Sequence, residues 1–122
     1  MRVMTWNVFW RWGGDYRERA PGIADTLRAY RPDVLGLTET WAGEGTSQPA
    51  ELAAALSTDG AVMHSAFART SLPPEPDPVE HPEQAGMWMG VGLVSRWPVS
   101  ATEVHDLPHH QRGGPAPTAL VT

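Results

Sequence analysis

The feature that most constrains the fold of this chain is a helical stretch that lies directly between two strand-like segments near the N-terminus. The first segment spans residues 2–8 and the second spans residues 33–39. Between them, an apolar stripe at helical spacing predicts a helix that begins near Arg19 or Ala20 and ends at Pro32. This β-α-β order makes the two strands parallel, so their carboxyl ends should meet at one edge of a sheet.

Two polar residues lie at the ends of these expected strands. Asn7 comes near the end of the first strand, and Glu39 ends the second. Ligand sites in open α/β sheets form outside the carboxyl ends of the strands, and a carboxylate with an amide oxygen suits a hard cation such as Mg²⁺. Taken alone, however, Glu39 is better explained as a cap for a backbone amide, and Asn7 could satisfy a turn.

The remainder of the chain is expected to add strands around one short helix that opens at Pro49. Strands are expected at residues 61–68, 87–95, 99–106 and 118–122. The second and third of these should form an antiparallel hairpin, and the proline-rich acidic segment 72–83 should be an exposed insertion. The first strand alternates without strong polarity on either side, which predicts that both faces of the sheet are covered.

Composition narrows the class of protein. A chain of 122 residues suits a single domain over residues 1–122, and the absence of cysteine excludes disulfides and thiolate metal sites. No apolar run reaches transmembrane length and no signal peptide is evident, so a cytoplasmic location is expected. The formal net charge is -5 and lysine is absent, so the chain lacks the broad basic surface of a tight nucleic-acid binder.

Two further sets of residues invite a functional interpretation. Three tryptophans fall in expected loops at the presumed site edge, where they could stack on a substrate: Trp10, Trp12 and Trp41. The histidine-rich segment 105–110 could suggest zinc, but it lies in a proline-flanked loop and offers no obvious fourth ligand. A solvated loop is therefore the favoured interpretation of that segment.

Three stretches of the sequence are informative together: Trp6-Asn7, Leu37-Thr38-Glu39 and the Gly-x-Gly-Leu-x-Ser-Arg-x-Pro pattern within residues 90–99. In combination they resemble the endonuclease/exonuclease/phosphatase superfamily of metal-dependent phosphoesterases. Each is weak alone, but their combination and spacing are specific, and the resemblance runs from Arg2 to Thr122. It implies an α/β (α+β) fold, a partial four-layer α/β/β/α sandwich whose mixed sheet opens with the β-α-β unit.

The resemblance also implies roles for individual residues. Glu39 matches the family's metal-ligating glutamate, with Mg²⁺ or Mn²⁺ as the cofactor. Asn7 matches the neighbouring asparagine that orients or contacts the metal and the phosphate, so both residues are candidate catalytic and metal-binding residues. Arg112 lies roughly where several members keep a substrate-binding arginine near the phosphate. Thr38 stands where the family commonly has glutamine before the glutamate.

Several motifs of the family have no counterpart in this sequence: its Asp-x-Asn motif, its later catalytic histidine and its C-terminal Ser-Asp-His motif. These residues supply the base that activates water and most contacts to the leaving phosphate. We therefore expect the chain to be the truncated N-terminal half of such a domain, which needs the missing C-terminal half and has negligible activity alone.

The sequence thus predicts a metal-dependent phosphoesterase that hydrolyses phosphodiester or phosphomonoester bonds. Its substrate could be a small molecule, a lipid headgroup or a nucleic acid, and the acidic balance favours a small phosphoester, a lipid headgroup or a nucleotide. One alternative is a non-catalytic remnant or binding module that retains the same sheet. Another is an unrelated doubly wound nucleotide-binding domain, which the lack of a glycine-rich first turn disfavours.

Overall fold

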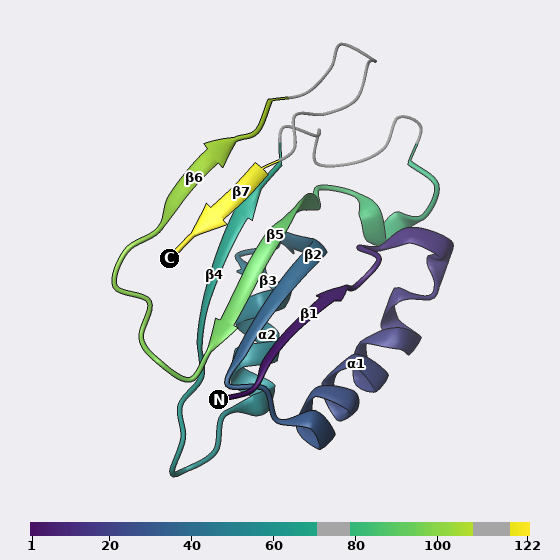
Figure 1. The fold of residues 1–122 in the computed structure, drawn as a ribbon. Helices are drawn as coiled ribbons and strands as arrows, with labels where there is room; N and C mark the ends of the chain where they lie inside the picture. Colours follow the sequence, from purple (N-terminus) through teal and green to yellow (C-terminus); the bar gives the residue numbers. More distant parts are fainter. Residues whose placement is uncertain (71–78, 109–117) are drawn as a thin grey trace.

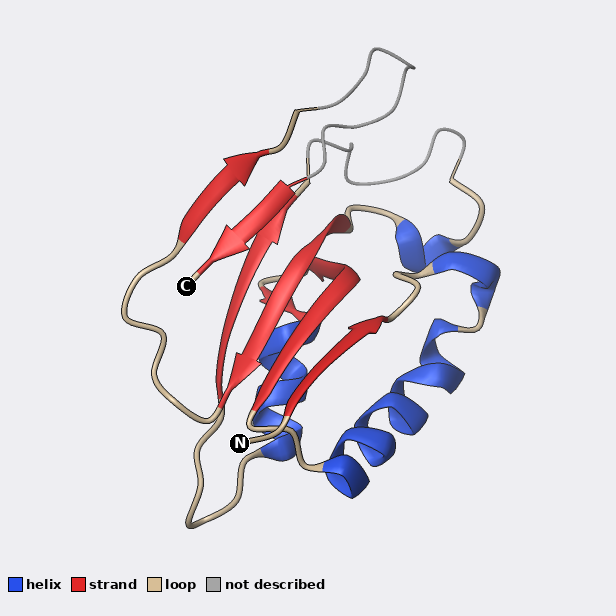
Figure 2. Ribbon diagram, in the orientation of Figure 1, coloured by secondary structure: helices blue, strands red, loops and turns tan. Residues whose placement is uncertain are grey.

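The computed structural model describes residues 1–70, 79–108 and 118–122 and consists of a mixed sheet with two α-helices on one face (Figures 1 and 2). The strands are β1 (Val3–Asn7), β2 (Val34–Gly43), β3 (Thr46–Ser47), β4 (His64–Arg69), β5 (Trp88–Ser95), β6 (Glu103–Asp106) and β7 (Thr118–Val121). The helices are α1 (Tyr16–Tyr30) and α2 (Gln48–Leu56), with single 3-10 turns at Trp12–Gly14 and Pro82–Gln84. No helix in the described ranges is long and apolar enough to cross a membrane.

The main sheet has the strand order β1-β2-β5-β4, and β3 pairs with the far end of β2. β1 and β2 are parallel, with registers running from Val3 opposite Val34 to Asn7 opposite Thr38. The remaining pairs are antiparallel, so the sheet is mixed. The expected β-α-β unit and the expected mixed α/β fold are therefore confirmed.

The expected hairpin between residues 87–95 and 99–106 is wrong. β5 lies between β2 and β4, so both of its edges are already hydrogen-bonded and neither can accept β6. β6 instead pairs with β7 in a separate two-stranded sheet, with Val104 opposite Leu120. β7 contacts both β4 and β5 without pairing with either, and it packs on the side of the main sheet away from α2 (Figure 1). The described residues therefore form three layers: the helices, the main sheet and a small second sheet.

The hydrophobic core lies between the two helices and the main sheet. Its buried side chains come from the loop after β1, from both helices and from β2 and β5: Val8, Ile23, Leu27, Leu35, Leu37, Leu52, Ala53 and Val94. α1 begins one turn earlier than the sequence suggests, because the carbonyl of Asp15 accepts from the backbone N–H groups of Glu18 and Arg19. It ends as expected before Pro32, and Arg31 takes a left-handed conformation with φ 48°.

The opposite face of β1 is exposed, which corrects the expectation that both faces are covered. Val3 is 64% exposed, and Thr5 and Asn7 on the same face are exposed too. Among the described residues, β7 of the second sheet contacts β4 and β5, and the second sheet makes no contact of similar extent with β1. The face that carries Asn7 is consequently accessible to solvent.

One carboxylate holds together the strand ends that lie at the other end of β1 from Asn7. Asp33 accepts hydrogen bonds from the Arg2 backbone N–H at 2.6 Å and from the Arg96 guanidinium at 2.7 Å. These two contacts, the backbone one first, hold the pKa of Asp33 below its usual value. Arg2 precedes β1, Asp33 precedes β2 and Arg96 follows β5, so these contacts hold three strand ends together away from the site.

The close approach of α2 to β5 depends on a glycine. A Cβ at Gly92 would lie 2.3 Å from Cγ of Pro49, whereas a Cβ at Gly22 in α1 would meet nothing within 4 Å. We expect Gly92→Ala to destabilise the protein by about 1–3 kcal/mol through overpacking. The matched change Gly22→Ala should stabilise it by about 0.5–1 kcal/mol through helix propensity. Urea denaturation of both variants measures the two effects, and equal effects would contradict this packing.

Candidate active site

Asn7 and Glu39 lie side by side, as the parallel order of β1 and β2 requires. The Nδ2 group of Asn7 donates a hydrogen bond to Oε1 of Glu39 at 3.0 Å. Asn7 is the last residue of β1 and is exposed, while Glu39 is half-buried. The structure therefore brings two of the three sequence-predicted site residues into direct contact.

Glu39 does not end its strand, which corrects the sequence expectation. β2 continues to Gly43 because it still pairs with β5 and β3 after β1 has stopped at Asn7. The pairing with β5 shifts register between Leu37 and Thr40, and Glu39 within this irregularity has φ 51°. A bulge of this kind bends the strand and redirects a side chain, here the carboxylate.

The amide of Asn7 has a fixed orientation. Its Oδ1 accepts from the Phe9 backbone N–H at 2.9 Å, and this donor requires an oxygen. The Nδ2 group must therefore face Glu39. In this arrangement the amide oxygen of Asn7 serves the backbone, and the amide nitrogen orients the carboxylate.

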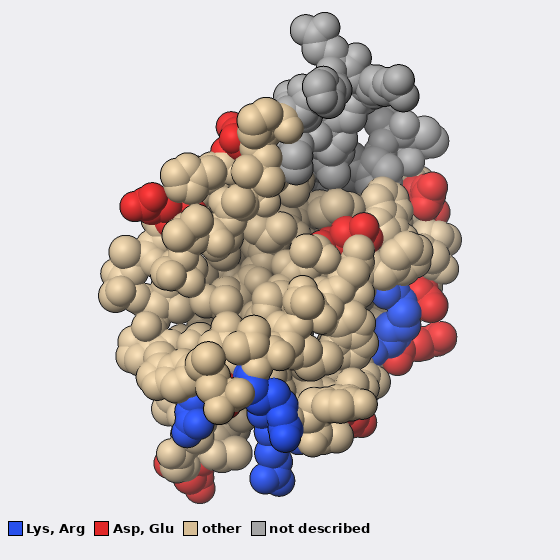
Figure 3. Space-filling view, in the orientation of Figure 1, with Lys and Arg blue, Asp and Glu red and all other residues tan. Residues whose placement is uncertain are grey.

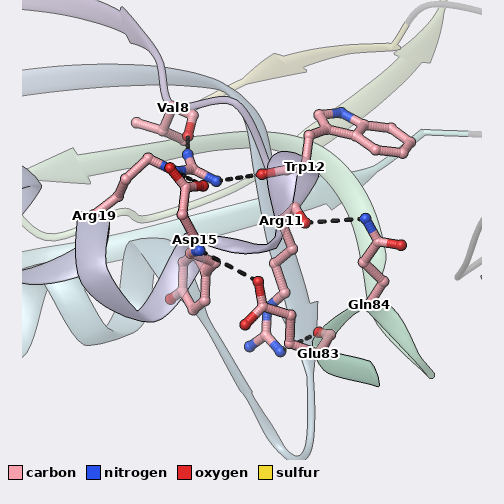
Figure 4. A network of polar contacts seen from close by, with 8 residues as sticks. Val8, Arg11, Trp12, Asp15, Arg19, Glu83 and Gln84 are labelled. Carbon is pink, nitrogen blue, oxygen red and sulfur yellow. Dashed lines mark hydrogen bonds and ion pairs between the residues drawn. The ribbon is translucent and has the colours of Figure 1, made fainter. Parts of the chain in front are cut away.

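The loop after Asn7 is held by Arg19 from α1 (Figure 4). Its Nε contacts the Asp15 carboxylate at 2.7 Å, and its two terminal nitrogens donate to the carbonyls of Trp12 at 2.8 Å and Val8 at 3.3 Å. One side chain thus bonds three points of the same loop. This cross-link compensates for a loop that contains the left-handed residues Phe9, Trp10, Gly13 and Gly14.

A second arginine joins this loop to the segment before β5. Arg11 is only 6% exposed, and its guanidinium lies 4.1 Å from the ring centre of Trp41 and 4.7 Å from that of Tyr16. It also donates to the carbonyl of Glu83 at 2.6 Å, and Nε2 of Gln84 donates to the carbonyl of Arg11 at 3.0 Å (Figure 4). The site edge is therefore fixed at both ends of the loop.

The tryptophans expected to stack on substrate are mostly core residues. Trp10 is 1% exposed and Trp41 is 2% exposed, so neither can contact a substrate. Trp12 is half-buried against Trp10, with ring centres 4.7 Å apart. The exposed aromatic residue beside the site is instead Phe9. Sequence reasoning missed it because nothing in the residue types marks a left-handed phenylalanine.

A groove borders the site between the end of β1 and α1. Its cavity volume is about 500 Å³. It is lined by Trp6, Asn7, Val8, Phe9, Glu18, Arg19, Gly22, Ile23 and Thr26. Asn7 and Phe9 belong to both the groove and the site, so a molecule that contacts Glu39 could extend into the groove.

The site offers few possible metal ligands, but these suit a hard cation. Within the described ranges, no group of three or more His, Cys, Asp or Glu residues could hold a metal ion. A single carboxylate fits Mg²⁺, which usually keeps several waters and takes oxygens from its substrate. His105 lies in β6, not in the expected loop, and contacts Glu103 at 3.2 Å. Arg112, His109 and His110 lie outside the described residues.

The fold and site define an α/β sandwich with a candidate metal-binding carboxylate at one end of its first two strands. The model of the Endonuclease/Exonuclease/phosphatase family matches residues 4–119, so the chain belongs to this family. The family comprises phosphoester hydrolases of the nuclease and phosphatase type, which generally depend on divalent metals. No curated protein matches the chain.

Two solved structures are similar to the chain. An endonuclease/exonuclease/phosphatase from Beutenbergia cavernae DSM 12333 shares 32% identity with a TM-score of 0.66, over 98% of this chain and 33% of that one. An endonuclease/exonuclease/phosphatase family protein from Leptotrichia buccalis C-1013-b shares 15% identity with a TM-score of 0.64, over 87% of this chain and 42% of that one. The chain therefore spans less than half the length of either protein.

The contact between Asn7 and Glu39 predicts a metal-dependent stability in one variant. Asn7→Asp keeps the oxygen that accepts from Phe9 but sets a second carboxylate about 3 Å from Glu39. Without a cation, this repulsion should cost about 1 kcal/mol, and Mg²⁺ should recover it. Thermal unfolding at pH 7, with EDTA or with Mg²⁺, measures the effect.

Asn7→Ala is the matched control for this experiment, since it removes both hydrogen bonds and adds no charge. It should be destabilised equally with and without Mg²⁺. If Mg²⁺ raises the melting temperature of Asn7→Ala as much as that of Asn7→Asp, the two carboxylates do not form a cation site.

Proposed function

We propose that this chain provides the metal-binding part of a divalent-metal-dependent phosphoesterase. Glu39 would bind Mg²⁺ or Mn²⁺, and Asn7 would orient the carboxylate. Family membership supports phosphoester hydrolysis in general, and the whole protein's activity, substrate and partners belong to this proposal because the chain spans less than half of either solved relative.

The observation that carries the proposal is the pair of hydrogen bonds made by Asn7. One fixes the amide on the Phe9 backbone, and the other directs its nitrogen to Oε1 of Glu39. The second oxygen of the half-buried carboxylate is then held in a defined direction without its own bond to Asn7. A preorganised anionic oxygen at an accessible strand end is what a hard cation requires.

The chemistry follows from the charge of the substrate. A phosphoester repels an attacking hydroxide, and a divalent cation held at Glu39 would offset that charge and the charge that develops on the leaving group. Asn7 contributes by keeping the Glu39 carboxylate from rotating. The rigid loop held by Arg19 contributes by fixing the N–H of Phe9 that orients Asn7.

The charge distribution supports a small phosphoester over a nucleic acid as substrate. The face in Figure 3 is mostly uncharged, and its arginines lie in separate groups at the margins. The formal net charge of the whole chain is -5. Tight nucleic-acid binding rests on many phosphate contacts made by a continuous basic surface, which this view does not present.

A binding module without catalysis is the second candidate function. It is favoured by the small donor set, since the described residues hold no cluster of three or more potential ligands. Such a module would bind a metal-phosphate complex at Glu39 without turning it over.

The proposal is tested by Mn²⁺ binding measured through paramagnetic broadening of amide NMR signals. Substoichiometric Mn²⁺ should first broaden the signals of Asn7, Glu39 and their neighbours. Glu39→Gln should abolish this broadening, because the amide keeps the shape of the side chain but loses its charge. Glu103→Gln, a matched change on the exposed strand β6, should leave it intact. Broadening around Glu39 that survives Glu39→Gln would contradict the metal site.

Turnover tests whether this chain alone carries a complete catalytic set. We expect the 122-residue chain alone to hydrolyse bis-p-nitrophenyl phosphate negligibly with Mg²⁺, since losing one catalytic group typically removes roughly 10²–10⁴ in rate. The assay compares the chain with Glu39→Ala. Turnover by the unaltered chain that disappears in Glu39→Ala would show that this chain carries a complete catalytic set and would contradict the expectation.

A further inference from the structure

Phe9 is presented to solvent beside the site in an unfavourable backbone conformation. Its side chain is 53% exposed, and its φ is 60°. A bulky residue at positive φ is a genuine outlier, and glycine or asparagine would adopt this conformation at lower cost. Strained residues of this kind cluster at functional sites, where the surrounding contacts determine them.

The contacts that determine Phe9 are those of the site itself. Its N–H donates to Oδ1 of Asn7 at 2.9 Å, and the N–H of Trp10 donates to the carbonyl of Glu39 at 2.6 Å. The guanidinium of Arg19 lies 5.3 Å from the centre of the Phe9 ring. Asn7, which orients the carboxylate, and Glu39, which would bind the cation, thus hold the backbone of Phe9 and Trp10 and place the ring beside the site.

The groove next to the ring is lined by both apolar and polar side chains. Phe9 and the half-buried Trp6 contribute accessible apolar surface, and the nearly buried Val8 and Ile23 lie beneath it. Glu18, Arg19 and Thr26 contribute polar groups from α1. With a volume of about 500 Å³, the groove falls in the size range of small-molecule sites.

We infer that Phe9 is a specificity-determining residue that contacts a planar aromatic part of the substrate, so that nucleoside phosphates are preferred over phosphorylated polyols. This inference rests on the proposed function, since the phosphate would lie at Glu39. A base stacks on an aromatic ring without requiring hydrogen bonds. A polyol over the same apolar surface would lose water contacts that Trp6 and Phe9 cannot replace.

The test compares the binding of adenosine 5′-monophosphate and ribose 5-phosphate, which has a hydroxyl group in place of the base, in NMR titrations of the 122-residue chain with Mg²⁺. The chain should bind the nucleotide about tenfold more tightly, as expected for one stacked base. Phe9→Leu, which keeps an apolar side chain but removes the flat ring, should abolish that preference. Phe9→Trp should restore it. The melting temperature of each variant checks that the fold is retained.

The outcomes separate the two proposals. Equal affinity for the two ligands in the unaltered chain, an equal loss of both in Phe9→Leu, or no binding of either would overturn the aromatic contact. A preference for the nucleotide that depends on Phe9 but is insensitive to both Mg²⁺ and Glu39→Gln would uphold the contact and overturn the metal site. A preference that depends on Phe9, Mg²⁺ and Glu39 together supports both.

Discussion

The structure of the site depends on the hydrogen bond between Asn7 and Glu39, and this bond depends on an irregularity in β2. β1 ends at Asn7, so the next residues of β2 are free to depart from regular pairing there. The register shift between Leu37 and Thr40 redirects Glu39 toward the Asn7 amide. In a regular strand the side chains alternate strictly between the two faces, so the sheet alone would set the direction of the Glu39 side chain.

The loop after β1 contributes the second half of the arrangement. Four hydrogen bonds fix it. Arg19 in α1 donates two to its backbone carbonyls, Arg11 donates one to Glu83, and Gln84 donates one to the carbonyl of Arg11. Arg11 is buried against Trp41 and Tyr16, and both rings lie in the core with it. The loop is therefore a rigid part of the scaffold, in keeping with sites that are built on fixed backbone.

The sequence predicts the parallel strands and the proximity of Asn7 to Glu39 because both follow from local periodicity and from the short β-α-β connection. It does not predict the bulge at Glu39, since that depends on the register of β5, about fifty residues away. The hairpin with β6 was a wrong prediction for the same reason, because neighbours in sequence usually pair but β5 is enclosed by β2 and β4. Likewise, the exposure of Phe9 and the burial of Trp41 arise from loop contacts that no local pattern encodes.

The proposed function depends above all on the binding of a divalent cation to the Glu39 carboxylate. Crystals of the chain grown with Mn²⁺, measured at the manganese absorption edge, test it directly by anomalous scattering. We expect an anomalous peak in direct contact with a carboxylate oxygen of Glu39, with the Asn7 amide still bonded to Oε1 of the same residue. Manganese bound elsewhere on the molecule, with no peak at Glu39, would contradict it.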